Sequence, residues 1–275
     1  MDDYRAVNRA SWDERVPAHA ASPDYKVDRF AADPQYLSEV VRFDLPRLGD
    51  ISGLRGVHLQ CHIGTDTVSL ARLGARMSGL DFSAPAVAQA QSFADSLGHE
   101  IDFHQADVYD AVEVLGAAQY DLVFTGIGAI GWLPSIERWA AVVAGLLKPG
   151  GRLFIREGHP MLWSLDVSKT SGELVLAAPY FETEAPQIWD EGGTYVETDV
   201  EFSHNVTHEW NHGLGEIFTA LTKAGLDVTD FEEHDSAPWE PLPGHMTRDE
   251  QGEWRLTDQP ERLPATYTLQ ARRRQ

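Results

Sequence analysis

The chain of 275 residues is 43% apolar and carries a formal net charge of −21 at pH 7. This composition can build a large core, and the negative field argues against nucleic acid or an anionic membrane as a partner. Cys61 is the single cysteine, which excludes an intrachain disulfide and favours a reducing, cytoplasmic location. We expect a monomer or a homodimer.

Residues 1–50 are predicted to form short helices and irregular segments. Four prolines are expected to break this stretch: Pro17, Pro23, Pro34 and Pro46. Because the stretch precedes the first predicted strand, it must pack outside the sheet or over a site, so we expect a helical lid. The start of the chain has no basic segment followed by an apolar one, which predicts no secretory signal, and no apolar run approaches the roughly 18 residues of a membrane span.

Strands and helices alternate from Gly56 onward. An apolar strand over residues 56–61 precedes a helix over 66–73, for which Thr65 or Asp66 is the expected N-cap. A helix that Ser83 opens and Gly98 ends has the N-cap, early proline and terminal glycine that typify helix boundaries. The remaining expected elements of this half are strands over 76–80, 101–106, 120–125 and 152–156, a helix over 136–147 and a tight turn over 148–151.

The alternation is lost over residues 160–212, an aromatic-rich stretch too long for an ordinary loop. It resumes with a helix over 214–224 and strands over 226–233 and 265–271. We therefore predict an α/β fold: a Rossmann-like three-layer sandwich with a mostly parallel, seven-stranded sheet. Residues 51–275 would form its main domain, in which the insertion 160–212 after the fifth strand serves as a substrate wall.

A glycine turn after the first strand and a carboxylate after the second indicate a ligand site. Ligands of open parallel sheets bind outside the carboxyl ends of the strands, where such a carboxylate can accept both ribose hydroxyls. Asp81 lies 17 residues after Gly64, close to the spacing of roughly 20 expected for that pair. The three turn glycines that a dinucleotide pyrophosphate requires are absent, so the pattern favours another adenosine-containing cofactor over NAD(P).

An ordered set of motifs resembles class I S-adenosylmethionine-dependent methyltransferases. The motifs are the strand–turn–helix at 56–74, Asp81-Phe82-Ser83, Ala106-Asp107-Val108, Tyr120-Asp121-Leu122-Val123-Phe124 and Leu146-Leu147-Lys148-Pro149-Gly150-Gly151. The resemblance covers residues 56–157, and residues 214–271 by topology. It implies methyl transfer from S-adenosylmethionine, with S-adenosylhomocysteine as the product.

The resemblance also implies the roles of individual residues. The turn containing Gln60, Cys61, His62 and Gly64 would approach the methionine end of the cofactor, as would Gly126 after the fourth strand. The adenosine end would be held by Asp81 at the ribose, Phe82 against the adenine, Asp107 at the adenine amine and Val108 through its backbone.

The turn departs from the family pattern, which has an acidic residue on the first strand and a Gly-x-Gly-x-Gly turn. The corresponding positions here hold His58, Gln60, His62 and Gly64, so a single turn glycine survives. Either the loop takes a different backbone path, or Gln60 and His62 fit because they avoid positive φ. His58 itself has the pattern of a hydrogen-bonded core histidine.

Four side chains are candidates for acid–base chemistry. His212 precedes the helix over 214–224, His159 and Glu157 lie at the end of the fifth strand, and Tyr25 belongs to the predicted lid. A histidine can accept a proton at neutral pH. It would deprotonate an acceptor held about 3–3.5 Å from the methyl carbon for in-line displacement.

The acceptor is expected to be planar. Six tryptophans lie outside the predicted core: Trp12, Trp132, Trp163, Trp189, Trp210 and Trp239. Aromatic faces suit a sulfonium cation and a planar substrate, although several of these rings would simply attach the insertion to the sheet. The segments 8–15 and 209–212 are similar to those of an actinobacterial group of small-molecule, natural-product methyltransferases, which implies a heteroaromatic, indole-like acceptor.

Two alternatives come from other classes of protein. His208-Glu209-Trp210-Asn211-His212 matches the H-E-x-x-H zinc-hydrolase pattern, in which two histidines one helical turn apart bind zinc. Gly213 and β-branched neighbours disfavour the helix that this chemistry needs, so we expect no bound metal. The eroded glycine turn leaves open a protein that binds S-adenosylmethionine without catalysis.

Overall fold

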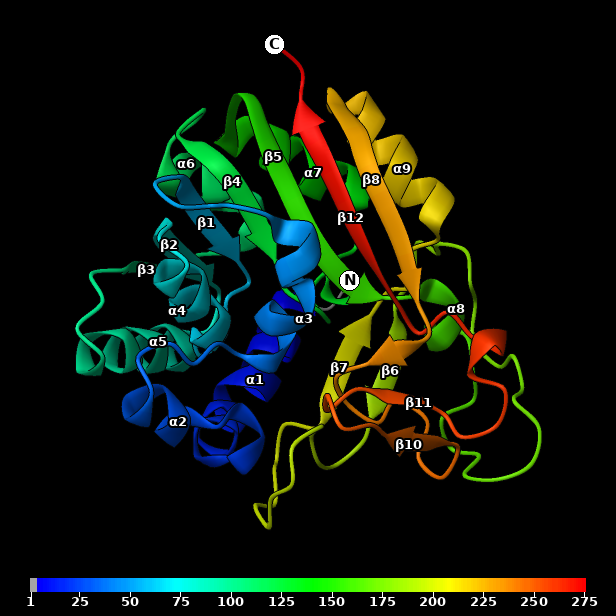
Figure 1. Cartoon of the computed structure of the whole chain (residues 1–275). Helices are drawn as coiled ribbons and strands as arrows, with labels where there is room; N and C mark the ends of the chain where they lie inside the picture. The colour runs from blue at the N-terminus through cyan, green and yellow to red at the C-terminus, as the bar shows by residue number, and fades with distance from the viewer. Residues whose placement is uncertain (1–3) are drawn as a thin grey trace.

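A seven-stranded sheet forms the centre of the protein, whose computed structural model describes residues 4–275 (Figure 1). The strand order is β3-β2-β1-β4-β5-β12-β8. β1 to β5 are parallel, and β12 is antiparallel to both of its neighbours. The strands are β1 (Arg55–Leu59), β2 (Arg76–Asp81), β3 (Asp102–Gln105), β4 (Tyr120–Thr125), β5 (Leu147–Gly158), β8 (Leu226–His234) and β12 (Thr266–Arg273). The predicted mostly parallel sheet that includes the last two strands is confirmed.

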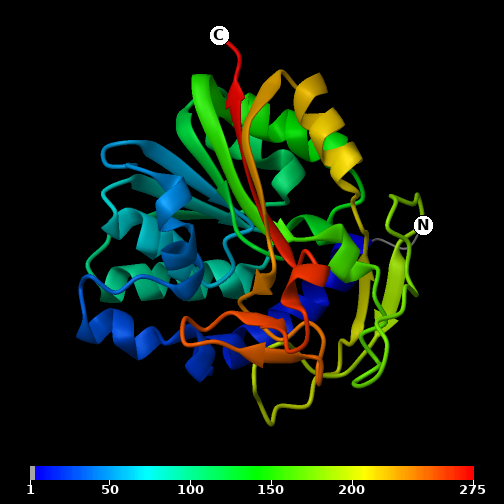
Figure 2. The ribbon, with the colours of Figure 1, turned by 45° about the vertical axis from the view of Figure 1, so that its right-hand side comes forward.

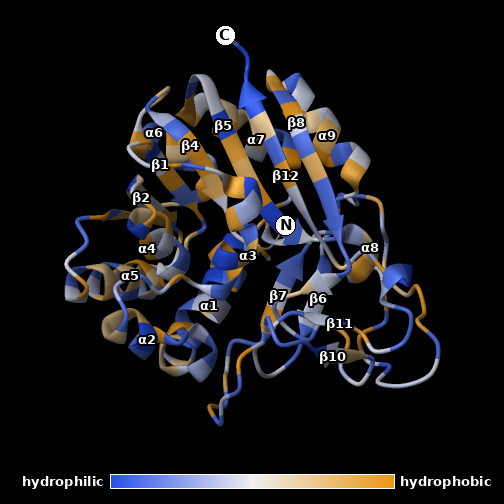
Figure 3. Cartoon of the chain, in the orientation of Figure 1, coloured by the Kyte–Doolittle hydropathy of each residue, from blue (hydrophilic) through white to orange (hydrophobic). Residues whose placement is uncertain are grey.

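Helices cover both faces of the sheet and complete the three predicted layers. One face carries α3 (Glu39–Leu48), α4 (Thr65–Arg72) and α5 (Ala84–Ser96); the other carries α6 (Ala111–Leu115), α7 (Ile136–Leu146) and α9 (Leu214–Lys223). Side chains alternate between the two cores: Leu153 and Ile155 of β5 pack toward α7 and α9, whereas Phe154 packs toward α3 to α5. Figure 3 shows the hydrophobic residues along these strands.

The predicted helical N-terminal stretch contains α1 (Tyr4–Ala21), a 3₁₀ turn (Pro23–Tyr25), α2 (Val27–Ala32) and α3; its first three residues lie outside the described part. Two of the prolines do not break it, because Pro17 lies inside α1 and Pro46 inside α3. On both sides of Pro17, α1 is bonded to the insertion, through Arg15 and His19. In residues 4–275, no helix has the length and hydropathy to cross a membrane.

The insertion holds small elements of its own. They are α8 (Pro160–Trp163) and an antiparallel pair, β6 (Gln187–Asp190) with β7 (Val206–Glu209). The chain segment that connects β8 to β12 forms a second small sheet, which the sequence pattern did not predict. Its strands are β9 (Ser236–Ala237), β10 (Met246–Arg248) and β11 (Trp254–Leu256). Figures 1 and 2 show both additions beyond the same end of the large sheet, where the parallel strands end.

Three local predictions are corrected. The residue that precedes α4 is Gly64, with φ +81°, and not Thr65 or Asp66. The expected turn over 148–151 is part of β5, because Leu147 already pairs with Tyr120 before a register shift. The third strand is shorter than predicted and spans Asp102–Gln105. A strand that begins before the register shift cannot be recognised from a Lys-Pro-Gly-Gly pattern, which is typical of turns.

Candidate active site

The turn between β1 and α4 passes through the left-handed backbone region at alternate residues. The φ angles are +55° at Gln60, +48° at His62 and +81° at Gly64. The idea that Gln60 and His62 avoid positive φ is therefore wrong, and the turn keeps the path that glycines would favour. A non-glycine residue in this conformation costs about 1–2 kcal/mol, so the surroundings must hold it there.

Specific hydrogen bonds hold this turn. Gln60 Nε2 donates to the carbonyl oxygen of Ala129 at 2.7 Å, and the backbone N–H of His62 donates to Asp81 Oδ2 at 2.8 Å. His62 Nε2 lies 2.8 Å from His19 Nδ1 of α1. The side chains at two glycine positions of the family pattern thus connect the turn to the loop after β4 and to α1.

Asp81 lies at the end of β2, where the sequence pattern placed it. Its side chain is buried, and its second oxygen, Oδ1, accepts a hydrogen bond from the backbone N–H of Ser83 at 3.0 Å. Burial raises the pKa of Asp81 to about 6, while the backbone donors at His62 and Ser83 lower it. The side chain is therefore ionised at neutral pH, and a carboxylate keeps lone pairs for further donors.

α1 covers the residues predicted at the adenine end. Arg5 Nε lies 3.0 Å from Asp107 Oδ2, and the Arg9 guanidinium lies 5.7 Å from the centre of the Phe82 ring. Asp107 Oδ1 accepts a hydrogen bond from the N–H of Tyr109, and Val108 is buried.

Polar atoms of His58 and Asp66 lie near Gly126, the residue that follows β4. His58 Nε2 and Gln60 Oε1 are buried without a hydrogen-bond partner. A Cβ atom on Gly126 would lie 3.3 Å from His58 Nε2 and 3.7 Å from Asp66 Oδ2. Burial lowers the pKa of His58 to about 3, so the ring is neutral, and its Nδ1 lies 2.9 Å from Thr67 Oγ1. This acceptor set fits the ammonium group of the predicted cofactor.

The side chain of Cys61 is buried beside this turn. Burial and the nearby charge of Asp81 raise the pKa of its thiol well above the ordinary value. The thiol is therefore protonated at neutral pH, so Cys61 can contact a cofactor through its backbone rather than as a nucleophile.

Six rings, one of them that of His62, contact one another beside the turn. We call them the Trp–His–Tyr cluster: Trp12, His19, Tyr25, His62, Trp132 and Tyr195. Trp12 lies at its centre, 5.2 Å from His62 and 5.3 Å from Trp132 between ring centres. His19 Nε2 lies 2.6 Å from Thr194 Oγ1, and the hydroxyls of Tyr25 and Tyr195 share a short hydrogen bond. Burial lowers the pKa of His19 to about 4, so its ring is neutral at pH 7.

The structure places one of the four predicted acid–base residues, Tyr25, in this cluster. Glu157 is instead buried under four backbone N–H groups, from Gly128, Ala129, Ile130 and Gly158. His212 is bonded through Nε2 to the carbonyl oxygen of Leu133 and through Nδ1 to Glu216. His159 bonds Glu233 and the N–H of Met161, so the ring nitrogens of both histidines are engaged in the fold.

His19 was missed by sequence reasoning because it belongs to no motif. Its spacing of seven residues from Trp12 places both on one face of a helix, and this is the signal that could have identified it. The tryptophans divide as expected: Trp12 and Trp132 belong to the cluster. Trp163 stacks on Trp239 at 5.7 Å, and Trp210 packs against Tyr4 of α1.

The histidines of the H-E-x-x-H pattern do not adopt the geometry that the zinc alternative requires. His208 and Glu209 lie on the strand β7 rather than on a helix. The backbone N–H and carbonyl groups of His208 bond the side chain of Asn8, whereas His212 faces Leu133 and Glu216. The pattern therefore serves to dock α1 on the insertion.

The strand order, the turn after β1 and the carboxylates after β2 and β3 define a class I methyltransferase fold. Residues 57–153 match the family model described as "Methyltransferase domain". A ubiquinone biosynthesis O-methyltransferase of Xylella fastidiosa is 25% identical over 247 residues, which cover 87% of this chain and 82% of the relative. The chain is a class I S-adenosylmethionine-dependent methyltransferase, and its cofactor is S-adenosylmethionine.

Solved structures share the fold. An S-adenosylmethionine-dependent methyltransferase from Mesorhizobium loti aligns with a TM-score of 0.58 at 22% identity, covering 85% of this chain and 95% of that one. Another, from Clostridium acetobutylicum, aligns with a TM-score of 0.55 at 13% identity and covers 90% of this chain and 95% of that one.

The left-handed conformation of Gln60 can be tested through the free energy of unfolding of two variants. Gln60→Gly and Gln60→Ala lose the same side-chain hydrogen bond to Ala129, but only glycine relieves the backbone. We expect the glycine variant to be the more stable of the two by about 1 kcal/mol in urea unfolding. At the exposed helical position Ala88, glycine should instead cost about 1 kcal/mol relative to alanine. Equal stability of the two Gln60 variants would contradict a left-handed Gln60.

Proposed function

We propose that this enzyme methylates a small aromatic or heteroaromatic molecule, indole-like in size, by in-line displacement from S-adenosylmethionine. The observation that supports it is the Trp–His–Tyr cluster, which lies directly against the side chain of the cofactor turn. Flat aromatic walls can hold a planar acceptor, and they stabilise the neighbouring sulfonium cation.

The chain's own residues would hold the cofactor along the ends of β1, β2 and β4. The backbone at Gln60, Cys61, His62 and Gly64 would contact the methionine part. Its ammonium group would donate, beside Gly126, to the unpartnered His58 Nε2 and to Asp66. Asp81 would accept the ribose hydroxyls. Phe82, Asp107 and Val108 would contact the adenine, with Asp107 shared between its amine and Arg5.

Residues 1–50 would act as the lid and the insertion 160–212 as the substrate wall of the main domain, 51–275. Hydrogen bonds between the two segments support this division. The Asn8 side chain bonds the backbone of His208 in both directions, at 2.8 Å each. Arg15 donates to the carbonyl oxygens of Gly193 and His204. Lid and wall thus meet above the turn and would exclude water from the transferred methyl group.

The acceptor's proton would pass to the histidines of the cluster. His19 and His62 are both neutral at pH 7, because burial lowers the pKa of each ring. A lone pair in this pair of rings can therefore accept a proton. The hydroxyl groups of Tyr195 and Thr194 lie within hydrogen-bond distance of His19, and Tyr25 is bonded to Tyr195, so these hydroxyls offer relay positions. We favour these groups over His212, His159 and Glu157 because the cluster includes His62 of the cofactor turn itself, whereas the polar atoms of those three residues bond groups outside the turn.

The relatives' names favour oxygen as the atom that is methylated. Several of them are named ubiquinone biosynthesis O-methyltransferases, at identities of 24–32%. An aromatic hydroxyl loses its proton during methylation, which agrees with a base beside the acceptor. The second candidate function, cofactor binding without catalysis, is separated from this one by the turnover assay below.

Binding of S-adenosylhomocysteine tests the role of Asp81. Asp81→Ala should weaken binding about tenfold or more in calorimetric titration, since a hydrogen bond to a charged group contributes about 1.5–3 kcal/mol. Because the pKa of Asp81 is about 6, the wild-type affinity should fall as the pH drops below that value, and the variant should lose this dependence. Asp102→Ala, at the exposed start of β3, is the matched control. Unchanged binding in Asp81→Ala would refute the ribose assignment.

Turnover with labelled S-adenosylmethionine and a panel of indoles and phenols tests the acceptor site. We expect transfer to at least one ring, with kcat/KM reduced about tenfold or more in Trp12→Ala by loss of the central wall. Trp254→Ala, on β11 outside the lid, the insertion and the cluster, should react like the wild type. Turnover of no acceptor by protein that binds S-adenosylhomocysteine would favour the non-catalytic alternative.

A further inference from the structure

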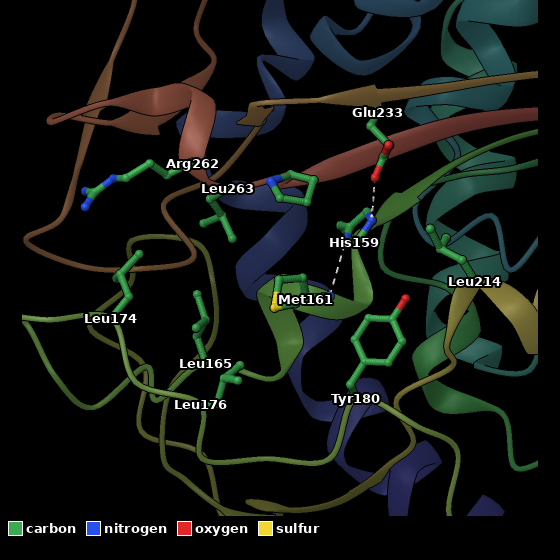
Figure 4. Close-up of a pocket in the computed structure, with 11 residues that line it drawn as sticks. His159, Met161, Leu165, Leu174, Leu176, Tyr180, Leu214, Glu233, Arg262 and Leu263 are labelled. Carbon is green, nitrogen blue, oxygen red and sulfur yellow. Dashed lines mark hydrogen bonds and ion pairs between the residues drawn. The ribbon is translucent and has the colours of Figure 1, made fainter.

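A cavity of about 480 Å³ lies away from the turn, where β5 and β8 end and β12 begins (Figure 4). Its volume is within the range of small-molecule sites, about 300–1,000 Å³. A water molecule occupies about 30 Å³, and a heavy atom of a ligand is of similar size. The cavity therefore has room for a ligand of about 10–15 heavy atoms. The insertion, α8 and the segment before β12 supply its walls.

One half of the cavity is aliphatic. Leu165, Leu174 and Leu176 of the insertion lie together in Figure 4, with Met161 and Leu263 beside them. Leu165 and Leu263 belong to a separate core cluster below the cavity, whereas the side chain of Leu176 is 65% exposed. An apolar ligand would therefore bury leucine surface that this fold leaves uncovered, at about 25 cal/mol per Å².

The opposite half is polar and carries a net negative charge. His159 Nε2 bonds Glu233 Oε1 at 3.0 Å and its Nδ1 accepts from the N–H of Met161, so the ring donates to the carboxylate. Burial lowers the pKa of His159, which leaves the charge of Glu233 uncompensated, and Glu233 is half exposed. The hydroxyl of Tyr180 points toward this end in Figure 4.

The cation at the rim does not neutralise this end. Arg262 donates to the carbonyl oxygens of Asp258 and Gln259, and in Figure 4 its guanidinium points away from His159 and Glu233. The polar end therefore offers a free carboxylate oxygen and a phenol hydroxyl.

The cavity is separate from the cofactor turn. In the sheet, β12 lies three strands from β1, which corresponds to roughly 14 Å at about 4.8 Å per strand. β4 and β5 stand between them, and Glu157 at the end of β5 is bonded there to backbone N–H groups of the loop after β4. A ligand in the cavity is thus distinct from the methyl acceptor beside His62.

We propose that this cavity is a second binding site, for a medium-chain aliphatic amine. The ammonium group would donate to Glu233 and Tyr180, and the chain would lie along Leu165, Leu174 and Leu176. The overall charge of −21 also favours a cationic over an anionic amphiphile. This site is independent of the proposed methyl acceptor.

Calorimetric titration of the full chain with octylamine, octanoate and 1-octanol tests the proposal. We expect octylamine to bind with a Kd below about 1 mM, at least tenfold tighter than octanoate. Glu233→Gln should weaken octylamine about tenfold without changing 1-octanol, and Leu174→Trp, which fills the aliphatic half, should weaken both.

Matched variants guard against misfolding. Glu250→Gln, in the exposed turn before β11, and Ile188→Trp, at the exposed β6 position, should bind octylamine like the wild type. Thermal unfolding midpoints would verify that the cavity variants fold. Absence of saturable octylamine binding, equal affinity for octanoate, or wild-type affinity in folded Leu174→Trp would each overturn the proposal. None of these results depends on whether the methyl-transfer assay succeeds.

Discussion

The left-handed turn after β1 is the constraint on which the rest of the site depends. Gln60 and His62 occupy a backbone conformation that usually requires glycine, so other contacts must stabilise them. The main-chain N–H of His62 is fixed by the carboxylate of Asp81, and Gln60 is fixed by Ala129. The same contacts that offset the strain set the positions of the ribose acceptor and of the loop after β4.

α1 extends this arrangement along the ends of β1, β2 and β3. Arg5, Arg9 and Asp13, each about one turn after the last, contact Asp107, the ring of Phe82 and the hydroxyl of Ser83. His19, six residues further along the helix, contacts His62. A single helix thus spans the residues predicted for the adenine, the ribose and the methionine. His62 stands where the family pattern has a glycine. Its side chain bonds His19, so α1 is also anchored at the methionine end.

The main sheet was predictable because its strands carry local signals. Tyr120–Thr125 is almost wholly apolar, as burial on both faces requires, and the carboxylates Asp81 and Asp107 follow strands at spacings that a motif can encode. The Trp–His–Tyr cluster could not be predicted, because it joins His19, His62 and Tyr195 from segments far apart in the sequence. His212 and Glu157 were plausible bases by position, but only the three-dimensional contacts reveal that backbone groups occupy their polar atoms.

Hydrogen exchange with and without S-adenosylhomocysteine tests most directly that the turn and α1 together form the cofactor site. The account predicts slower amide exchange at residues 60–66 and 81–83, and across α1, when the ligand is bound. Exchange in β10 and β11, which lie in the separate small sheet, should stay unchanged. Saturating ligand that leaves the turn and α1 unprotected, or that protects only the region around β10 and β11, would contradict the account.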